Sequence, residues 1–351
     1  MTIDKNKSGI FFGWWTVVVT GIVSGLGLGF YMYGISALFK PISLELGLSR
    51  AATSGATGIG FMIGSLLSPA TGWLVDKFGP KLSIVIGLLM VIAGLVLMYF
   101  VNSGWEFYLV WGILMGTGVF WGFTVAIDKS LNDWFVKKIG LALGVKFSVI
   151  GLTGAISLPL ASWLISAVGW RMTCLLWAGI LTLGIPFILL FVKNKSPEHY
   201  GLIPDGNRVN PDPESGAVSQ EEIRTSDAAG LQEKDFSFRQ AIKTNAFWML
   251  AVSYIAQFFI TTGFNTHCIP FLTEMNIDPI IAGSMMGIMI IFTIPSRFLC
   301  GVFADRVPKD RLKLLMALPF LILLFGIASF LVNPSTISIY ILLVFYGLAH
   351  G

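Results

Sequence analysis

Two basic residues stand within long apolar stretches of the sequence, where a charged side chain needs a specific partner. Arg297 follows a run of 18 residues, 279–296, without Asp, Glu, Lys or Arg, and Lys146 precedes the charge-free run 147–170. A charge near the middle of a membrane helix costs about 2.5–3.5 kcal/mol on insertion scales, so it usually faces a cavity or a counter-ion. The Arg297 guanidinium offers a planar pair of donors that fits a carboxylate. We therefore expect Arg297 to bind an anionic substrate; the alternative is an arginine that donates to backbone carbonyls near its helix end.

Three kinds of side chain could complete such a site. Lys146 could flank the same anion, or one dianion, together with Arg297. The alternative is that its aliphatic chain extends along the helix and places the ammonium at the membrane interface. His267 could carry a proton because imidazole titrates near neutral pH, or it could be a hydrogen-bonded histidine at a helix end. Tyr31 and Tyr33 each combine an aromatic ring with a polar tip, and packing is the alternative role for Tyr33.

Long stretches of sequence without charged residues predict the helices that position these side chains. Of the 351 residues, 55% are hydrophobic and only 12% are charged, against about 25% charged in a soluble domain. This composition excludes a soluble enzyme, a disordered protein and a nucleic-acid binder. A helix needs about 20 apolar residues to cross the hydrocarbon layer, and a barrel strand needs only about 10 alternating ones. Eight runs of 18 to 32 residues lack every charged residue, at 8–39, 51–75, 82–105, 107–127, 147–170, 172–192, 244–273 and 279–296.

We predict an all-α membrane protein with about ten transmembrane helices. Six helices form an N-terminal bundle over 1–192, a charged linker rich in Pro and Gly spans 193–244, and four helices form a partial bundle over 245–351. The turn signal Asn333-Pro334-Ser335 separates the last two helices. The ten helices are predicted at 11–39, 52–75, 82–101, 105–127, 140–166, 170–192, 245–273, 280–303, 312–332 and 336–351.

The distribution of Lys and Arg predicts the orientation of the chain. With the N-terminus inside, 18 of the 23 basic residues lie in inner segments and 3 lie in outer ones, while Lys146 and Arg297 remain within helices. Positive charge concentrates on the cytoplasmic side. We therefore expect a multi-pass protein of the cell membrane whose N-terminus and central linker are cytoplasmic. The first apolar run is too long for a cleavable signal peptide and is read as the first helix.

Two cytoplasmic loops share a pattern at the same place in each half. Each has a Gly, three residues, an Asp, a basic residue and a further basic residue three or four positions on. Such repeated halves are typical of one class of secondary transporter, whose site lies between the halves. We expect these charges to act as a gate at the inner mouth, with anchoring of the topology as the alternative. The residues are Asp76, Lys77, Gly79 and Lys81 in the first loop, and Asp305, Arg306 and Lys309 in the second.

The first loop resembles the signature G-x-L-x-D-x-x-G-x-K/R of the major facilitator superfamily, and the second copy lacks the later Gly. Segments 134–144 and 196–206, together with Arg297, resemble the monocarboxylate and oxalate:formate porter branch. The resemblance implies two pseudo-repeated six-helix bundles. This sequence reaches only the tenth helix, so we expect the second bundle to be truncated and the chain to be C-terminally incomplete. It also implies that an arginine at the Arg297 position holds a carboxylate, and that a histidine at the His267 position is common.

We expect a secondary active transporter of small organic anions, either mono- or dicarboxylates, that works by alternating access. The resemblance also implies that Tyr33 replaces a proton-linked lysine of animal relatives, which favours exchange, although the coupled ion could be a proton or a counter-anion. The alternatives are a transporter of a drug or neutral metabolite, and a non-transporting truncated relic. No enzyme activity, cofactor, metal or nucleic-acid partner is expected, and the chain is expected to be a monomer.

Overall fold

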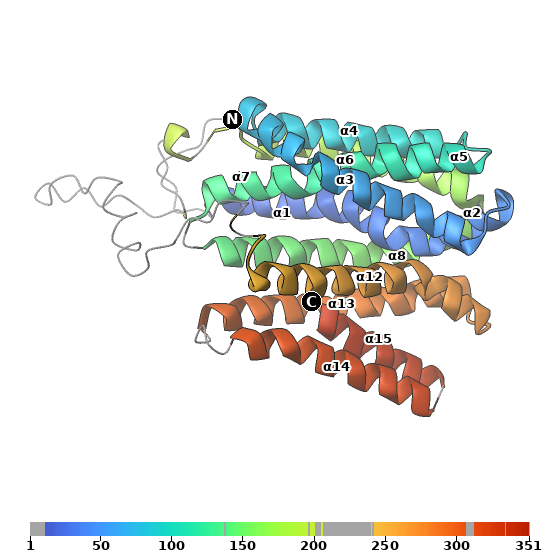
Figure 1. The fold of residues 1–351 in the computed structure, drawn as a ribbon. Helices are drawn as coiled ribbons and strands as arrows, with labels where there is room; N and C mark the ends of the chain where they lie inside the picture. Colours follow the sequence, from blue (N-terminus) through green and yellow to red (C-terminus); the bar gives the residue numbers. More distant parts are fainter. Residues whose placement is uncertain are drawn as a thin grey trace, which may run out of the picture. The chain divides into compact units, whose positions relative to one another are not determined.

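The computed structural model describes residues 11–136, 138–195, 197–200, 205, 240, 242–306, 312–333 and 335–350. Within these ranges the chain forms helices joined by short turns and contains no strand (Figure 1). Contacts divide the chain into a large unit, Met1–Gly206 with Phe264–Gly351, and a small unit, Asn207–Gly263. The predicted division into 1–192, 193–244 and 245–351 remains a prediction.

The first part of the large unit runs through long helical segments that reverse direction at each turn. Helix α1, the wider π-helical segment η1 and α2 continue into one another from Phe12 to Glu45, and four of the ten residues of η1 are glycine. Gly169, with φ 81°, breaks the helix Ile139–Thr182 into two arms. The elements are α1 (Phe12–Ser24), η1 (Gly25–Gly34), α2 (Ile35–Glu45), α3 (Arg50–Phe78), α4 (Pro80–Met98), α5 (Gly104–Phe107), η2 (Tyr108–Met115), α6 (Gly116–Phe120), η3 (Trp121–Val125), α7 (Ala126–Trp134), α8 (Ile139–Thr182), α9 (Gly184–Phe191) and the short η4 (Pro197–Tyr200).

The second part contains four long helices. They are α12 (Asn245–Glu274), α13 (Pro279–Arg306), α14 (Leu312–Val332) and α15 (Thr336–His350). Residues 264–274 of α12 belong to the large unit, and the preceding residues of that helix belong to the small one. Helix α13 packs along α8 over much of its length and also packs against α15.

Buried side chains explain how these helices associate. One core cluster, within the first part, contains Trp111, Trp134 and Trp177. The other cluster joins Tyr33 of η1 to Met289 of α13 and other apolar residues of α8, α12, α13 and α15. Glycine allows close approach between helices. A side chain at Gly87 of α4 would collide with the backbone of Gly122.

Seven helical segments in the described part of the chain are long and apolar enough to cross a membrane, and two further apolar helices, Ala317–Val332 and Thr336–His350, are shorter. The chain is therefore a multi-pass membrane protein. Because the helices reverse direction, the turns fall at two ends. The Glu45 end contains the turns 46–49, 99–103 and 275–278. The Asp76 end contains Gly79, residues 135 and 136 after α7, and the turn 192–195.

Several helices extend beyond the ranges predicted from charge-free runs. The helix predicted at 105–127 continues to Trp134, and the helix predicted at 11–39 continues through Lys40 to Glu45. The helix predicted at 280–303 continues to Arg306. The reason is that a charge at a membrane surface ends the apolar run without ending the helical hydrogen bonding.

Candidate functional site

Arg297 lies within α13, where that helix packs against α8. Its Nη1 atom donates to the backbone carbonyl of Phe147 at 3.3 Å, and its Cζ atom lies 5.6 Å from the centre of the Phe147 ring. The His350 imidazole lies within electrostatic range of the guanidinium. No carboxylate within salt-bridge distance of Arg297 is found among the described residues. Arg297 therefore donates to a backbone carbonyl, as one of the two alternatives expects, and its binding of an anionic substrate remains a prediction.

Lys146 has a carboxylate partner that the sequence analysis did not anticipate. The Lys146 side chain is 2% exposed, and its Nζ atom lies 2.5 Å from Oδ1 of Asp128, whose side chain is 42% exposed. Asp128 lies in α7, in the part of the helix that extends past the predicted end at residue 127. The ammonium is therefore buried against an acid.

Phe147 brings the two basic residues into one neighbourhood. The Lys146 Nζ atom lies 4.9 Å from the Phe147 ring centre, and the Arg297 guanidinium contacts both the ring and the carbonyl of the same residue. Lys146 of α8 and Arg297 of α13 therefore contact the same phenylalanine, and their shared role in binding an anion remains a prediction.

His267 lies apart from this pair and joins α12 to α2 and α3. Its Nε2 atom shares a hydrogen bond of 3.2 Å with Oγ of Ser54, and its ring meets the Phe39 ring edge-on at 5.0 Å. One helical turn from Ser54, Arg50 forms an ion pair with Glu274.

A backbone contact reinforces this junction. The backbone N–H of Ile269 in α12 donates to Oγ of Ser36 in α2 at 3.0 Å. These contacts hold α2 and α3 against α12 at the Glu45 end.

Tyr31 and Tyr33 have different surroundings although both lie in η1. Tyr31 is fully buried and stacks on Trp111 at 5.2 Å, and a side chain at Gly60 would collide with its hydroxyl. Tyr33 belongs instead to the apolar cluster shared with α13, and its ring lies against Gly154 of α8. A role in substrate binding remains a prediction for both, and Tyr33 has the position closer to α13.

The first copy of the predicted gating motif connects neighbouring helices at the Asp76 end. Asp76 pairs with Lys129 of α7 at 3.6 Å, which in turn lies 3.6 Å from Asp133. Lys77 stacks over the Trp73 ring at 4.9 Å. Because these groups are largely exposed, each pair stabilises the fold only weakly.

Gly79 and Lys81 complete this motif against the end of α9. Gly79 has φ 87°, a conformation that glycine adopts most readily. The Lys81 backbone N–H donates to Oδ1 of Asn194 at 3.0 Å, and its ammonium donates to the Leu189 carbonyl. In the second copy, Asp305 and Arg306 end α13, their side chains lie outside the described part, and Lys309 lies outside the described residues altogether.

Most of the predicted linker 193–244 also lies outside the described residues. Within segment 196–206 the structure describes 197–200 and Asp205. The Asp205 carboxylate accepts hydrogen bonds from the backbone N–H groups of Val136, at 3.2 Å, and Lys138, at 3.0 Å. This residue therefore ties the start of the linker to the turn between α7 and α8.

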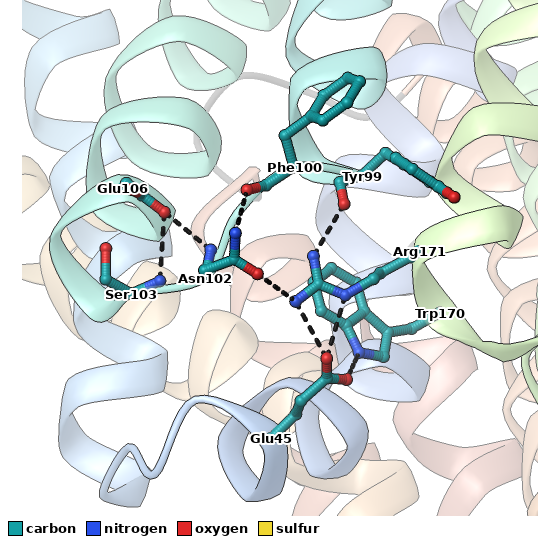
Figure 2. Close-up of polar contacts among 8 residues, drawn as sticks. All are labelled: Glu45, Tyr99, Phe100, Asn102, Ser103, Glu106, Trp170 and Arg171. Atoms are coloured by element: carbon teal, nitrogen blue, oxygen red, sulfur yellow. Dashed lines mark hydrogen bonds and ion pairs between the residues drawn. The ribbon is translucent and has the colours of Figure 1, made fainter.

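A polar network fastens the first part of the large unit at the Glu45 end (Figure 2). The Glu45 carboxylate accepts from Arg171, 2.9 Å away, and from the Trp170 indole. Arg171 also donates to the Tyr99 carbonyl at 2.7 Å and to the Asn102 side chain at 3.2 Å. The network joins α2, the turn after α4 and the second arm of α8.

These observations define a multi-pass, all-helical membrane protein with a basic site where α8 meets α13. In the described part of the chain no group of three His, Cys, Asp or Glu side chains could hold a metal ion. The sequence profile of the Major Facilitator Superfamily matches residues 19–351, and the chain therefore belongs to this superfamily.

Similar proteins confirm the expected resemblance to the monocarboxylate and oxalate:formate branch. The oxalate:formate antiporter of Oxalobacter formigenes is 26% identical over 251 residues, which are 72% of this chain and 54% of the antiporter. Monocarboxylate transporter 13 of Bos taurus is 28% identical over 161 residues, which are 46% of this chain and 35% of that protein. The rat protein of the same name is 23% identical over an alignment of 352 positions, which covers 97% of this chain and 72% of that protein. The chain thus spans about half the length of the antiporter.

A solved structure agrees on the fold. The D-xylose-proton symporter superposes with a TM-score of 0.63 at 14% sequence identity, covering 95% of this chain and 79% of that one. At this identity the likeness concerns the fold alone. It supports the major facilitator architecture and carries no information on the substrate.

Proposed function

We propose that this chain is a secondary active transporter of small organic anions, mono- or dicarboxylates, that works by alternating access. The observation that carries the proposal is Arg297, a guanidinium within a membrane helix that faces no carboxylate among the described side chains. A charge in that position is unfavourable without a partner, and a substrate carboxylate would supply one in bidentate geometry. The names of the relatives, an oxalate:formate antiporter and monocarboxylate transporters, support the same substrate class.

The proposed architecture has ten membrane crossings in the described part of the chain. The break at Gly169 would divide Ile139–Phe191 into two crossings, and α14 and α15 would add two more to the remaining segments. We propose two pseudo-repeated bundles, 1–192 and 245–351, joined by the linker 193–244. The Asp76 end and the linker would face the cytoplasm of a cell with this protein in its inner membrane.

Alternating access would require the contacts at the two ends to break and form in turn. At the Glu45 end, α3 and α12 are joined by His267 and Ser54 and by Arg50 and Glu274. We propose that these contacts close the outer side and separate when the site opens outward. Asp76, with Lys77 and Lys81, would form the corresponding gate on the inner side, with Asp305 and Arg306 as its counterpart. A proton or a counter-anion would be the coupled ion.

The test is counterflow of carboxylates into proteoliposomes that contain the 351-residue chain. Arg297→Gln removes the charge but keeps donors for the Phe147 carbonyl, so it separates substrate binding from a backbone contact. We expect uptake of at least one of formate, oxalate, lactate and succinate by the wild type, loss of that uptake in Arg297→Gln and partial retention in Arg297→Lys. Full uptake by an inserted Arg297→Gln variant would overturn the proposal.

A further inference from the structure

The two cations beside Phe147 differ in whether their charge is already balanced. Lys146 contacts the Asp128 carboxylate at 2.5 Å, whereas Arg297 donates to a neutral carbonyl. Lys129, the residue after Asp128 in α7, lies 3.6 Å from both Asp76 and Asp133. Within the described side chains, the neighbourhood of Phe147 therefore presents one uncompensated positive charge from Arg297.

Burial of the lysine stabilises the ion pair between Lys146 and Asp128. The lysine side chain is 2% exposed while the aspartate side chain is 42% exposed, so the ammonium is the partner that water does not reach. A buried charge that loses its partner is strongly destabilising. Lys146 is consequently unavailable to a second anion as long as the Asp128 carboxylate remains in place.

We propose that Asp128 determines the charge of the substrate by acting as an internal counter-ion for Lys146. With Lys146 neutralised, Arg297 alone holds the anion, and the site selects molecules with one carboxylate over those with two. This inference rests on the proposed function and narrows its substrate class to monocarboxylates. Asp128 acts through Lys146 and is a specificity-determining residue that does not contact the substrate.

Lys146 and Arg297 both contact Phe147, so removal of the carboxylate would leave two unbalanced cations beside one side chain. The Lys146 ammonium and the Arg297 guanidinium lie 4.9 Å and 5.6 Å from the centre of the same ring. Asp128→Asn keeps the size and shape of the side chain but leaves the ammonium uncompensated. The two basic groups would then both favour an anion, and a small dianion could satisfy both of them.

The experiment measures binding, by the thermal stabilisation of the purified 351-residue chain in detergent at constant ionic strength. The probes are formate and lactate as monoanions, and oxalate and succinate as dianions. We expect the wild type to respond to monoanions and to bind dianions at least tenfold more weakly. Asp128→Asn should gain at least tenfold in dianion affinity. The double variant Asp128→Asn/Lys146→Met lacks the extra cation and should return to the preference of the wild type.

Several outcomes would overturn the inference. A wild type that binds dianions as tightly as monoanions contradicts it without any variant, and so does a folded Asp128→Asn protein with unchanged preference. If Asp128→Asn does not fold, the Lys146→Met variant tests the inference instead. Its unpaired aspartate should repel anions and weaken monoanion binding at least tenfold. Unchanged monoanion binding in this variant contradicts the inference. If no carboxylate binds to any form, the proposed function itself fails, and the inference fails with it.

Discussion

The Nε2 atom of His267 lies 3.2 Å from the Oγ atom of Ser54, one helical turn from the ion pair between Arg50 and Glu274. All four side chains join α3 to α12 at the Glu45 end. His267 contacts both α3 and α2 from α12, and its place beside the substrate remains a prediction. These contacts favour a role for His267 in closing the Glu45 end.

Weakening this junction should expose the native cysteine next to His267. Cys268 is 5% exposed, and in a variant with Cys174 and Cys300 replaced by Ala it is the single thiol. We expect Ser54→Ala/Glu274→Gln to raise its rate of reaction with a water-soluble maleimide severalfold, because both the hydrogen bond and the ion pair are lost. The rate is followed by mass spectrometry of the reconstituted protein.

The matched control for the junction changes a serine of the same helix whose hydroxyl bonds within α3. Ser68→Ala removes a hydroxyl that donates to the Gly64 carbonyl within α3, so the labelling rate of Cys268 should stay at the starting value. Equal rates in the junction variant and in this control would contradict the closing role.

The long helices could be predicted from the sequence because apolar runs fix where a chain crosses lipid. The partner of Lys146 could not, because the charge-free run 107–127 ends one residue before Asp128. A signal was nevertheless present. Asp128 and Lys146 are each nine residues from position 137, and antiparallel helices joined by a short turn bring such symmetric positions together.

Gly79→Ala should destabilise the protein because its backbone conformation excludes a side chain. Gly79 has φ 87° and ψ 160°, and an added Cβ would lie 2.8 Å from the side chain of Asn194. Such strain costs about 1–3 kcal/mol, and the contact between Asn194 and the Lys81 backbone would also be disturbed. The melting temperature in detergent measures the effect.

Gly72→Ala, in the same motif, is the control for this substitution. Gly72 is helical, and an added Cβ would meet nothing within 4 Å. An alanine in a helix interior is favoured over glycine by up to about 1 kcal/mol. We expect an unchanged or raised melting temperature for this variant. Equal melting temperatures of Gly72→Ala and Gly79→Ala would show that alanine causes no strain at position 79.

Arg171→Ala should loosen the network at the Glu45 end (Figure 2). The arginine makes hydrogen bonds to Glu45, Tyr99 and Asn102 and stacks on Trp170. Hydrogen bonds to charged groups contribute about 1.5–3 kcal/mol, and the partial exposure of Glu45 lowers the expected loss to about 1–2 kcal/mol. Thermal unfolding in detergent should show a lower melting temperature, whereas unchanged unfolding would mean that the network adds nothing to stability.

The network also illustrates which contacts the sequence leaves undetermined. The sequence predicts Arg171 only as one of three basic residues on the outer side. A charge in a loop can help to orient the chain in the membrane without an ion-pair partner, so its sequence position names no partner. Its contact with Glu45 joins residues that are 126 positions apart. A pairing of this kind depends on which helices become neighbours, and composition and charge patterns do not specify that.

The proposed orientation predicts opposite labelling of the two ends of the bundle in intact cells. Leu44, at the Glu45 end, is 80% exposed, and Lys195, at the Asp76 end, is also exposed. In a protein whose three native cysteines are replaced by Ala, we expect Leu44→Cys to react with a membrane-impermeant maleimide added outside and Lys195→Cys to react only after the membrane is permeabilised. The expectation follows from the excess of Lys and Arg on the Asp76 side, since positive charge is retained in the cytoplasm. The reverse labelling pattern would invert the topology, and the inner and outer gates proposed for Asp76 and His267 would exchange places.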